Sequence, residues 1–244
     1  MKKYIMFLLS FVLVISFSAC KKTDNNTEPA SESSVEDYYI IVNGETLSKN
    51  YIGYFFYIAQ ETMLSEAGWN KENSTPQDVK TYWETTEIDG VNAVDAARDA
   101  AVKNAVEQKV KYFKAVSEGI VLSDVDLKSI DEYISSTIAE NGGEQQFAEK
   151  LKKTGTDIDS YRQITIENEL INRLFQKYTT EGVLTITDEE FSDFYNDNID
   201  KLSPEEMADA AIKSKFNAMV KEWEKEFTIS INDKGMDEFV ILYN

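Results

Sequence analysis

The chain contains no histidine, one cysteine and only three prolines among its 244 residues. The absence of histidine excludes Ser-His-Asp and Cys-His nucleophile systems, zinc sites built on imidazole, and proton transfer by an imidazole side chain. A single cysteine cannot form a disulfide within the chain. We therefore expect a protein that is not an enzyme and that carries neither a cofactor nor a metal.

Positive charge is also scarce. The chain has 25 lysines and arginines against 44 aspartates and glutamates, which gives a net charge of −19. Such a field repels phosphate backbones, so we expect no nucleic acid partner. The chain is rich instead in apolar side chains, with 42% hydrophobic and 12% aromatic residues. This composition argues against disorder and supports a sizeable hydrophobic core.

The amino terminus has the parts of an export signal. Residues 1–3 read Met-Lys-Lys, and residues 4–17 are an almost unbroken apolar run. That run is shorter than the roughly 20 residues that a membrane-spanning helix needs, which indicates a signal peptide.

The run ends in Phe17-Ser18-Ala19-Cys20. These four residues resemble the lipobox of bacterial lipoproteins, in which the cysteine is lipidated and becomes the first mature residue, although Phe17 stands where leucine is more common. We expect residues 1–19 to be removed and Cys20 to carry lipid. A diacyl anchor attaches stably, which would hold the protein on the extracytoplasmic face of the cell membrane. The alternative is a plain secretory signal with an incidental cysteine.

Residues 20–37 are rich in Lys, Thr, Asn, Ser and Glu. Such a stretch cannot bury apolar area and is typical of a flexible tether. We find no comparable linker further along the chain. Residues 38–244 are therefore expected to form a single domain.

Start signals and apolar spacing predict that this domain is mainly α-helical. Cap residues followed by an early proline or an acidic third residue occur at Thr75, Thr187 and Ser203. Valines from Val102 to Val116 recur at spacings of three and four, which predicts a buried stripe on the longest helix. The helices expected from these signals cover residues 48–66, 75–83, 91–118, 123–140, 144–153, 157–178, 187–196 and 203–227.

Two short β-prone runs, at residues 39–42 and 228–231, lie at opposite ends of the domain. Neither has an evident hairpin partner nearby, and a lone strand would leave its backbone groups unpaired. The sequence therefore predicts that the two runs pair with each other. The expected fold is a helical domain closed by a two-stranded β ribbon.

Several short motifs occur in a recognisable order. Val-Asn-Gly-Glu at 42–45 leads into a helix, Glu-Gly-Ile-Val-Leu-Ser-Asp occupies 118–124, and residues 183–190 read Val-Leu-Thr-Ile-Thr-Asp-Glu-Glu. Between and after them stand Gly143, Phe147, Leu151, Gly155, Tyr161, Arg162, Ile164, Leu170, Phe194 and Tyr195. This order resembles the SurA and PrsA family of extracytoplasmic foldases over about residues 39–231. The resemblance implies a helical chaperone domain that binds unfolded exported polypeptides.

One departure from that family is large. Members with prolyl isomerase activity insert a parvulin domain after the segment that here ends at Asn198. In this chain only residues 199–202 separate that point from the cap at Ser203, and the histidines on which a parvulin site depends are absent. The resemblance therefore implies the chaperone module without isomerase activity.

Other chemistry has little support. The acidic pairs Glu189-Glu190 and Glu205-Glu206 stand at predicted helix starts, where the helix dipole explains them, and adjacent residues on a helix do not converge. No segment has the spacing of a calcium loop or of a glycine-rich phosphate loop. We expect Arg162 to be a salt-bridged structural residue.

Two classes of function remain open. A membrane-tethered chaperone needs an apolar concave surface that accepts many sequences, and we expect it as a cradle between the long helix and the closing helix. The alternative is a non-catalytic binding or structural lipoprotein with one fixed protein partner, which would show a flat, compact patch. The candidate client-binding residues, each of which could instead be ordinary core, are Tyr54, Phe56, Tyr57, Met63, Met219 and Trp223.

Overall fold

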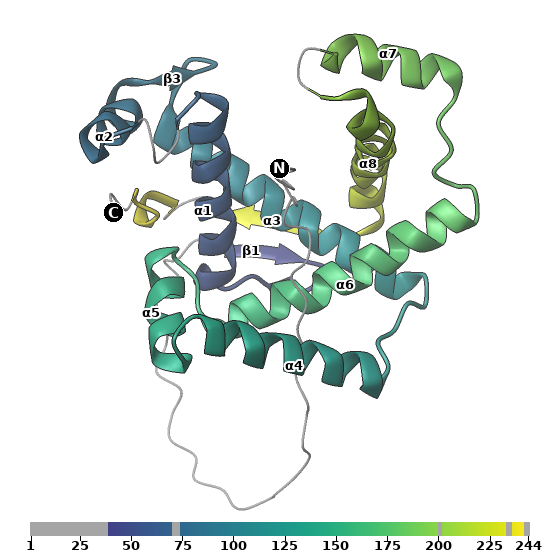
Figure 1. The fold of residues 1–244 in the computed structure, drawn as a ribbon, viewed down its shortest axis with the longest axis horizontal. Coiled ribbons are helices and arrows are strands. Elements are labelled where there is room, and N and C mark those ends of the chain that lie inside the picture. The colour runs from purple at the N-terminus through teal and green to yellow at the C-terminus, as the bar shows by residue number, and fades with distance from the viewer. Residues whose placement is uncertain (1–38, 70–73, 200–201, 233–235, 242–244) are drawn as a thin grey trace, which may run out of the picture.

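The computed structural model describes residues 39–69, 74–199, 202–232 and 236–241 (Figure 1). In this part of the chain the protein is mainly helical, as predicted, with eight α-helices and two small antiparallel sheets. Cys20, the predicted signal peptide and the predicted tether lie outside the described residues. In chain order the elements are β1 (Tyr39–Val42), β2 (Glu45–Thr46), α1 (Lys49–Glu66), α2 (Pro76–Thr85), β3 (Glu87–Ile88), β4 (Val91–Asn92), α3 (Ala93–Ser117), α4 (Asp124–Glu140), α5 (Glu144–Lys153), α6 (Ile158–Thr180), α7 (Asp188–Asn198), α8 (Pro204–Trp223), the 3₁₀ turn η1 (Glu224–Glu226), β5 (Ile229–Asn232) and the 3₁₀ turn η2 (Met236–Glu238).

Several helices begin where their capping residues predict. The Thr75 hydroxyl accepts the Asp78 amide, and the Asp78 carboxylate accepts the Thr75 amide, so that α2 starts with a reciprocal capping box. The same arrangement begins α4 at Ser123 and α7 at Thr187. Each box satisfies two backbone groups that a helix end would otherwise leave without partners.

The predicted pairing of the two terminal strands is confirmed. β1 and β5 are antiparallel, with Ile40 opposite Ile231 and Val42 opposite Ile229. The expectation of only two strands is wrong, because β2 pairs with the other side of β1 and makes a sheet in the order β2-β1-β5. The turn between β1 and β2 is Asn43-Gly44, both with positive φ, which suits a two-residue hairpin.

The longest helix begins two residues later than expected, because a second hairpin precedes it. β3 and β4 pair across Asp89-Gly90, again two residues with positive φ. Val91, which we expected in the helix, is therefore a strand residue, and α3 begins at Ala93 with the Asn92 side chain as its cap.

The core is built around α3, which packs between α1 and α6 (Figure 1). The face of α3 that is buried carries alanines at every fourth position from Ala93 to Ala105, together with Val106 and Val110. Small side chains let the α1 backbone come close. The predicted valine stripe is thus partly wrong: Val102 is only partly buried and Val116 is exposed, because the alanine row occupies the core side.

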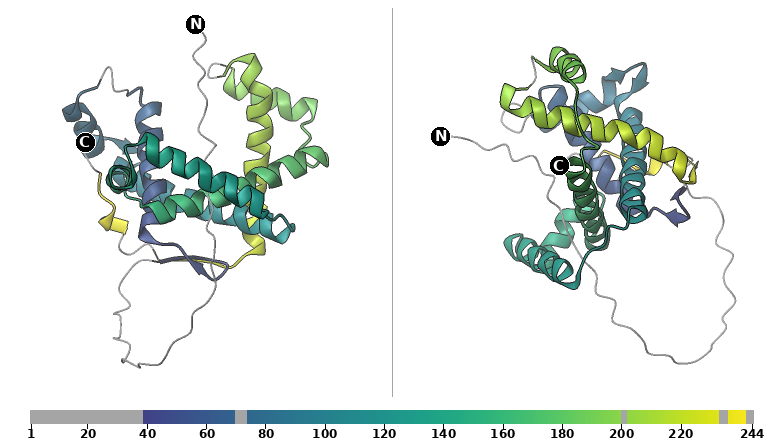
Figure 2. Two further views of the ribbon diagram at one scale, coloured as in Figure 1. Left: turned by 60° about the horizontal axis from the view of Figure 1, so that its bottom comes forward. Right: turned by 90° about the vertical axis from the view of Figure 1, so that its right-hand side faces the viewer.

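Two groups of helices flank this centre. Figures 1 and 2 show α4 and α5 on one side of α6, and α7 and α8 on the other. The α4–α5 pair closes its own small core on α6, through Ile130, Ile134, Phe147, Leu151 and Tyr161. On the other side, α7 buries none of its residues.

Candidate polypeptide-binding groove

A groove of about 900 Å³ runs along α1. Its walls come from α1, from α2, from residues 152–156 at the end of α5 and just beyond it, and from residues 238–241 near the carboxyl end. Figure 1 shows the last of these segments beside α1, between α2 and α5. The apolar residues that line the groove are Phe56, Tyr57, Leu64, Trp69, Pro76, Val79, Trp83, Phe239, Val240 and Ile241.

One face of α1 forms the longest wall. Gly53, Phe56, Tyr57, Gln60 and Leu64 all line the groove, and their spacings of three and four place them on the same side of the helix. Phe56 is almost fully buried, whereas Tyr57 is partly exposed. Burial raises the pKa of Tyr57 above its ordinary value, and the nearby Glu61 carboxylate raises it further.

An aromatic cluster forms the α2 side of the groove. Trp83 is fully buried, and its ring meets the Tyr82 ring edge-on with the centroids 4.9 Å apart. The Trp69 ring lies 6.3 Å from the Tyr82 ring, measured between centroids. Edge-to-face packing is a favourable arrangement for large rings, so this wall presents well-packed apolar surface.

The carboxyl-terminal segment, residues 236–241, closes the groove. Arg98 of α3 holds its backbone: Nε and Nη2 donate to the Phe239 carbonyl at 3.0 and 2.8 Å, and Nη2 donates to the Asp237 carbonyl at 3.2 Å. The Phe239 ring then packs against Phe56 with the centroids 5.6 Å apart. The groove wall is thus completed by a short segment that one guanidinium fixes in place.

The charged side chains at the groove are mixed in sign. Lys49 pairs with Glu238 across the groove and lies over the Phe239 ring, 5.9 Å from its centroid. Lys152, Lys153 and Glu61 also line it. Among the described residues, no cluster of acidic or cysteine side chains could hold a metal ion. Apolar walls with such a rim can bury side chains of a bound polypeptide without selecting one charge pattern.

The predicted client-binding residues do not all lie together. Phe56 and Tyr57 line the groove. Tyr54 and Met63, also on α1, are partly buried and pack against the main core, as does Met219 of α8. Trp223 is 4% exposed and belongs to the core itself, so it offers no surface to a client.

The aromatic residues of the closing helix, which we expected at a cradle beside the long helix, are buried: Phe216 is 5% and Trp223 is 4% exposed. The Phe216 ring of α8 meets Phe175 of α6 at 5.3 Å and Trp223 at 5.4 Å, both between centroids. Trp223 in turn lies 6.0 Å from the Tyr178 ring. These aromatic residues therefore stabilise the docking of α8 on α6, and the groove lies along α1 instead.

Several groove residues were missed by sequence reasoning. Leu64 continues the spacing that Phe56 and Tyr57 begin, so the helical period could have identified it. The apolar run Phe239-Val240-Ile241 is visible near the end of the chain and could have been read as an element that needs a docking site. Nothing local in the sequence predicts that Arg98, far away on α3, holds that run.

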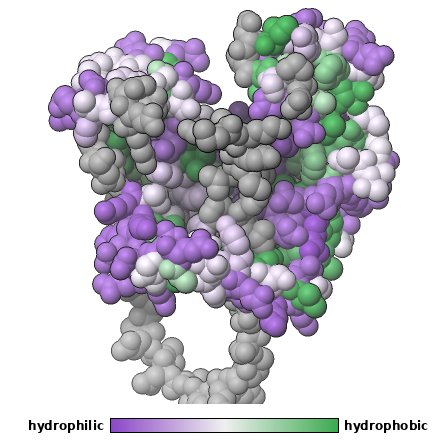
Figure 3. All heavy atoms as spheres, viewed as in Figure 1, coloured by the Kyte–Doolittle hydropathy of each residue, from purple (hydrophilic) through white to green (hydrophobic). Residues whose placement is uncertain are grey.

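A second apolar surface lies outside the groove. Phe191 and the flanking residues Val183 and Ile199 are exposed on and beside α7. Figure 3 shows apolar residues gathered over α7 and α8.

A buried charged cluster lies in the core, away from the groove. Lys109 and Glu167 are almost completely buried and pair at 2.5 Å, and the Tyr51 hydroxyl donates to Glu167 at 2.6 Å. Lys109 also pairs with Glu45, which accepts a bond from Gln163 at 2.8 Å. Burial raises the pKa of Glu167, against the opposing effect of Lys109. Glu45 ends the Val-Asn-Gly-Glu motif, so this motif fastens the β1–β2 turn to α3 and α6.

Arg162, from the same set of motifs, is salt-bridged as predicted, since its Nη2 donates to Asp131 at 2.6 Å.

Comparison with known proteins adds no relative: no family model, no curated protein and no solved structure matches the chain. Among the described helices, none is both long and apolar enough to cross a membrane.

Proposed function

We propose that this protein is a membrane-anchored extracytoplasmic chaperone that holds unfolded exported polypeptides in the α1 groove. The observation that carries the proposal is the groove itself, because aromatic and aliphatic side chains from α1, Trp69, α2 and residues 239–241 line it. A surface of that kind binds by burying apolar side chains, which all unfolded chains expose, so it accepts many sequences.

The sequence motifs support the same proposal. Their order resembles the SurA and PrsA foldases, and two of them have structural roles here: Glu45 joins the buried charged cluster, and Gly155 lines the groove. α7 ends at Asn198 and α8 begins at Pro204, which leaves no room between them for a parvulin domain. The proposed activity is therefore holding, without acceleration of X-Pro isomerisation.

Anchoring belongs to the proposal as well. Lipid on Cys20 would keep the domain at the cell membrane, and residues 20–37 would let it reach chains as they emerge. The net charge of −19 would keep a complex with an apolar client in solution.

The test is the aggregation of chemically denatured citrate synthase, followed by light scattering at increasing molar ratios of the full chain. We expect suppression at a few-fold excess, and a clear loss of suppression in Tyr57→Ser and Trp69→Ser, which shorten the aromatic walls. Circular dichroism should show that both variants keep the helical content of the wild type. Aggregation that proceeds unchanged at several-fold excess of the wild type would contradict the proposal.

The second candidate is a lipoprotein with one fixed partner, and the exposed surface around Phe191 favours it. A single matched variant separates the two functions. Phe191→Ser removes an exposed ring from α7 and leaves the groove intact. If it abolishes protection while Tyr57→Ser does not, the α7 surface and not the groove is the binding site.

A further inference from the structure

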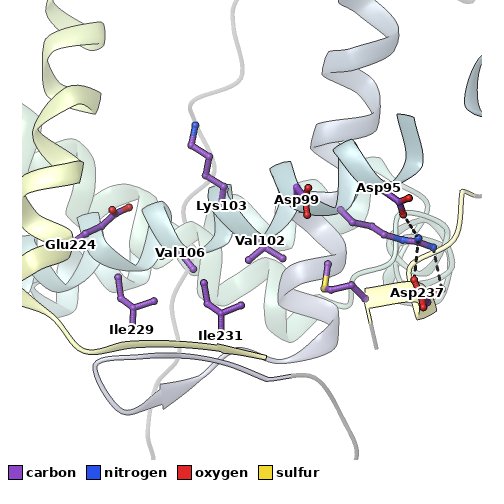
Figure 4. Close-up of a pocket in the computed structure, with 11 residues that line it drawn as sticks. Asp95, Asp99, Val102, Lys103, Val106, Glu224, Ile229, Ile231 and Asp237 are labelled. Atoms are coloured by element: carbon purple, nitrogen blue, oxygen red, sulfur yellow. Dashed lines mark hydrogen bonds and ion pairs between the residues drawn. The ribbon is translucent and has the colours of Figure 1, made fainter. Parts of the chain in front are cut away.

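A second, smaller cavity of about 550 Å³ lies between α3 and β5. Figure 4 shows Ile229 and Ile231 of β5 pointing toward Val102 and Val106 of α3 across it. Ile231 is 50% exposed, although Ile40, the residue opposite it in β1, is fully buried on the same face of the sheet. α3 therefore covers the middle of the sheet and leaves the apolar side of β5 partly open.

β5 is an edge strand. In the order β2-β1-β5, it has a neighbour on one side only within the described part of the chain. The Asn43 amide donates to the Thr228 carbonyl at 2.7 Å, so residue 228 faces β1. Because backbone groups alternate in direction along an antiparallel strand, residues 230 and 232 also face β1. The backbone N–H and C=O groups of Ile229 and Ile231 then point to the free edge.

The two edges of this sheet differ in how they are protected. The β2 edge is only two residues long, and the Glu45 side chain in it is tied to Lys109. β5 is four residues long and reads Ile-Ser-Ile-Asn, without lysine or proline. Natural edge strands are commonly protected by short length, charge or proline. β5 has neither charge nor proline, and the apolar cavity lined by Val102, Val106, Ile229 and Ile231 lies beside it.

The charged residues that line this cavity differ in whether they form ion pairs. Arg98 is engaged by Asp95 at 2.7 Å, by Asp237 and by the carboxyl-terminal segment. Lys103 lies 3.7 Å from Glu107. By contrast, Asp99 and Glu224 line the cavity and form no ion pair within the described residues. The charge available to a partner at this site is therefore negative.

We propose that the free edge of β5 binds an extended polypeptide segment as a fourth, antiparallel strand. The residues of this segment that lie opposite Ile229 and Ile231 would be β-branched or aliphatic. Their side chains would fill the cavity between β5 and Val102. Basic residues two positions before and after them would face Asp99 and Glu224. A second copy of this chain is the poorer occupant, because each copy carries a charge of −19. The β5 edge would recognise the backbone of its partner, whereas the α1 groove would bury apolar side chains. The proposal for β5 therefore does not depend on the proposed function of the groove.

The probe is the acetylated and amidated heptapeptide Lys-Thr-Val-Thr-Val-Thr-Lys, labelled for fluorescence anisotropy. Its lysines and valines share one face, which would lie toward α3. In an antiparallel pair, two opposite residues whose backbone groups point toward each other form two hydrogen bonds, one from each N–H to the other C=O. The valine amides of the peptide would therefore donate to the carbonyls of Ile229 and Ile231. Methylating the two valine nitrogens should abolish binding, whereas methylating the outer-facing threonine nitrogens should preserve it. Glutamate in place of both lysines should weaken it at least about tenfold.

The protein variant is Ile231→Pro, with Ile231→Val as its matched control. Proline removes an N–H that faces away from β1, a position where edge strands tolerate it. We expect Ile231→Pro to lose at least about tenfold in affinity for the heptapeptide, because a backbone hydrogen bond to the peptide and an apolar contact are both lost. Ile231→Val keeps both the amide and a branched side chain, and should bind like the wild type. Tyr57→Ser should also bind the heptapeptide normally, which separates this site from the groove.

Hydrogen exchange of the unmodified protein gives a readout that does not depend on any variant. The Ile229 and Ile231 amides should exchange much faster than the Ser230 amide, and saturating heptapeptide should slow them at least about tenfold. Unchanged exchange at these two amides, or equal affinity of the valine-methylated peptide, would overturn the proposal. Protection that rises with protein concentration in the absence of peptide would show that a second copy occupies the edge instead.

Discussion

Gly53 of α1 and Gly155 of the turn after α5 meet backbone to backbone. A Cβ atom on Gly53 would overlap the carbonyl oxygen of Gly155 and would lie 2.8 Å from its carbonyl carbon. Gly155 itself has a φ of +74°, a conformation that other residues rarely adopt. The two glycines therefore bring α1 and the α5–α6 turn together, and both line the groove.

Gly53→Ala should destabilise the protein by about 2 kcal/mol, because forcing an extra carbon into a packed contact costs roughly 1–3 kcal/mol. Helix propensity alone predicts the opposite, a gain of about 1 kcal/mol for alanine within a helix. Urea unfolding followed by circular dichroism separates the two. A midpoint equal to or above that of the wild type would contradict the close contact.

Lys109→Met should destabilise the protein by about 3–5 kcal/mol, because it leaves the Glu167 carboxylate buried without its cation. Lys103→Met on the same helix is the control: Lys103 is exposed, and its pair with Glu107 should contribute less than about 1 kcal/mol. Adding Glu167→Gln to Lys109→Met should recover part of the loss. Equal unfolding midpoints for the two lysine variants would mean that the buried cluster does not stabilise the fold.

Acid should destabilise the protein through its paired carboxylates. The Arg173 and Ser123 side chains, which donate to Asp126, hold the pKa of Asp126 well below its usual range, and Lys177 lowers the pKa of Glu118. Since these pKa values are lower in the folded than in the unfolded chain, the unfolded chain binds protons first. The free energy of unfolding should therefore fall as the pH decreases below about 5.

Asp126→Asn tests this assignment. The variant should be less stable than the wild type at pH 7 and should lose less stability between pH 5 and pH 3, because one of the responsible carboxylates is gone. Urea midpoints at several pH values give both slopes. Parallel slopes would show that Asp126 does not contribute to the acid sensitivity.

Cys20→Ala should leave the protein unprocessed or release it from the membrane, because the lipid is expected on that sulfur. Fractionation of cells, followed by mass spectrometry of the mature amino terminus, measures both outcomes. Recovery of the unmutated mature protein with a free Cys20 thiol would instead indicate a plain secretory signal.

Features set by neighbouring residues were predictable from the sequence. The Thr75–Asp78 and Thr187–Glu190 capping boxes involve residues three apart, and both place their helices correctly. The pairing of β1 with β5 followed from the need of each strand for a partner. The β1–β2 hairpin was missed because β2 is only two residues long, although Asn43-Gly44 is its turn signal.

Features set by distant residues were not predictable. The fit of Gly53 against Gly155 depends on how α1 crosses a turn about a hundred residues later, and no local pattern encodes it. In the sequence, nothing distinguishes Arg98 from other arginines on helices. Its hydrogen bond to the Phe239 carbonyl is evident only in the folded structure. We expected Trp223 to bind clients, but it is buried in the core. The spacing of aromatic residues could not show this, because it is the same whether that face of the helix meets a client or the core.

The position of β1 at the centre of the sheet has a consequence for the order of folding. Its two neighbours are β2, which follows it immediately, and β5, which follows all eight described helices. A chain that emerges from its amino terminus can form the first hairpin at once, but one side of β1 must wait until nearly the whole domain has emerged. Contacts between such distant residues form slowly. Until they form, this protein exposes an unpaired strand of its own, the same hazard that the proposed function would relieve in others.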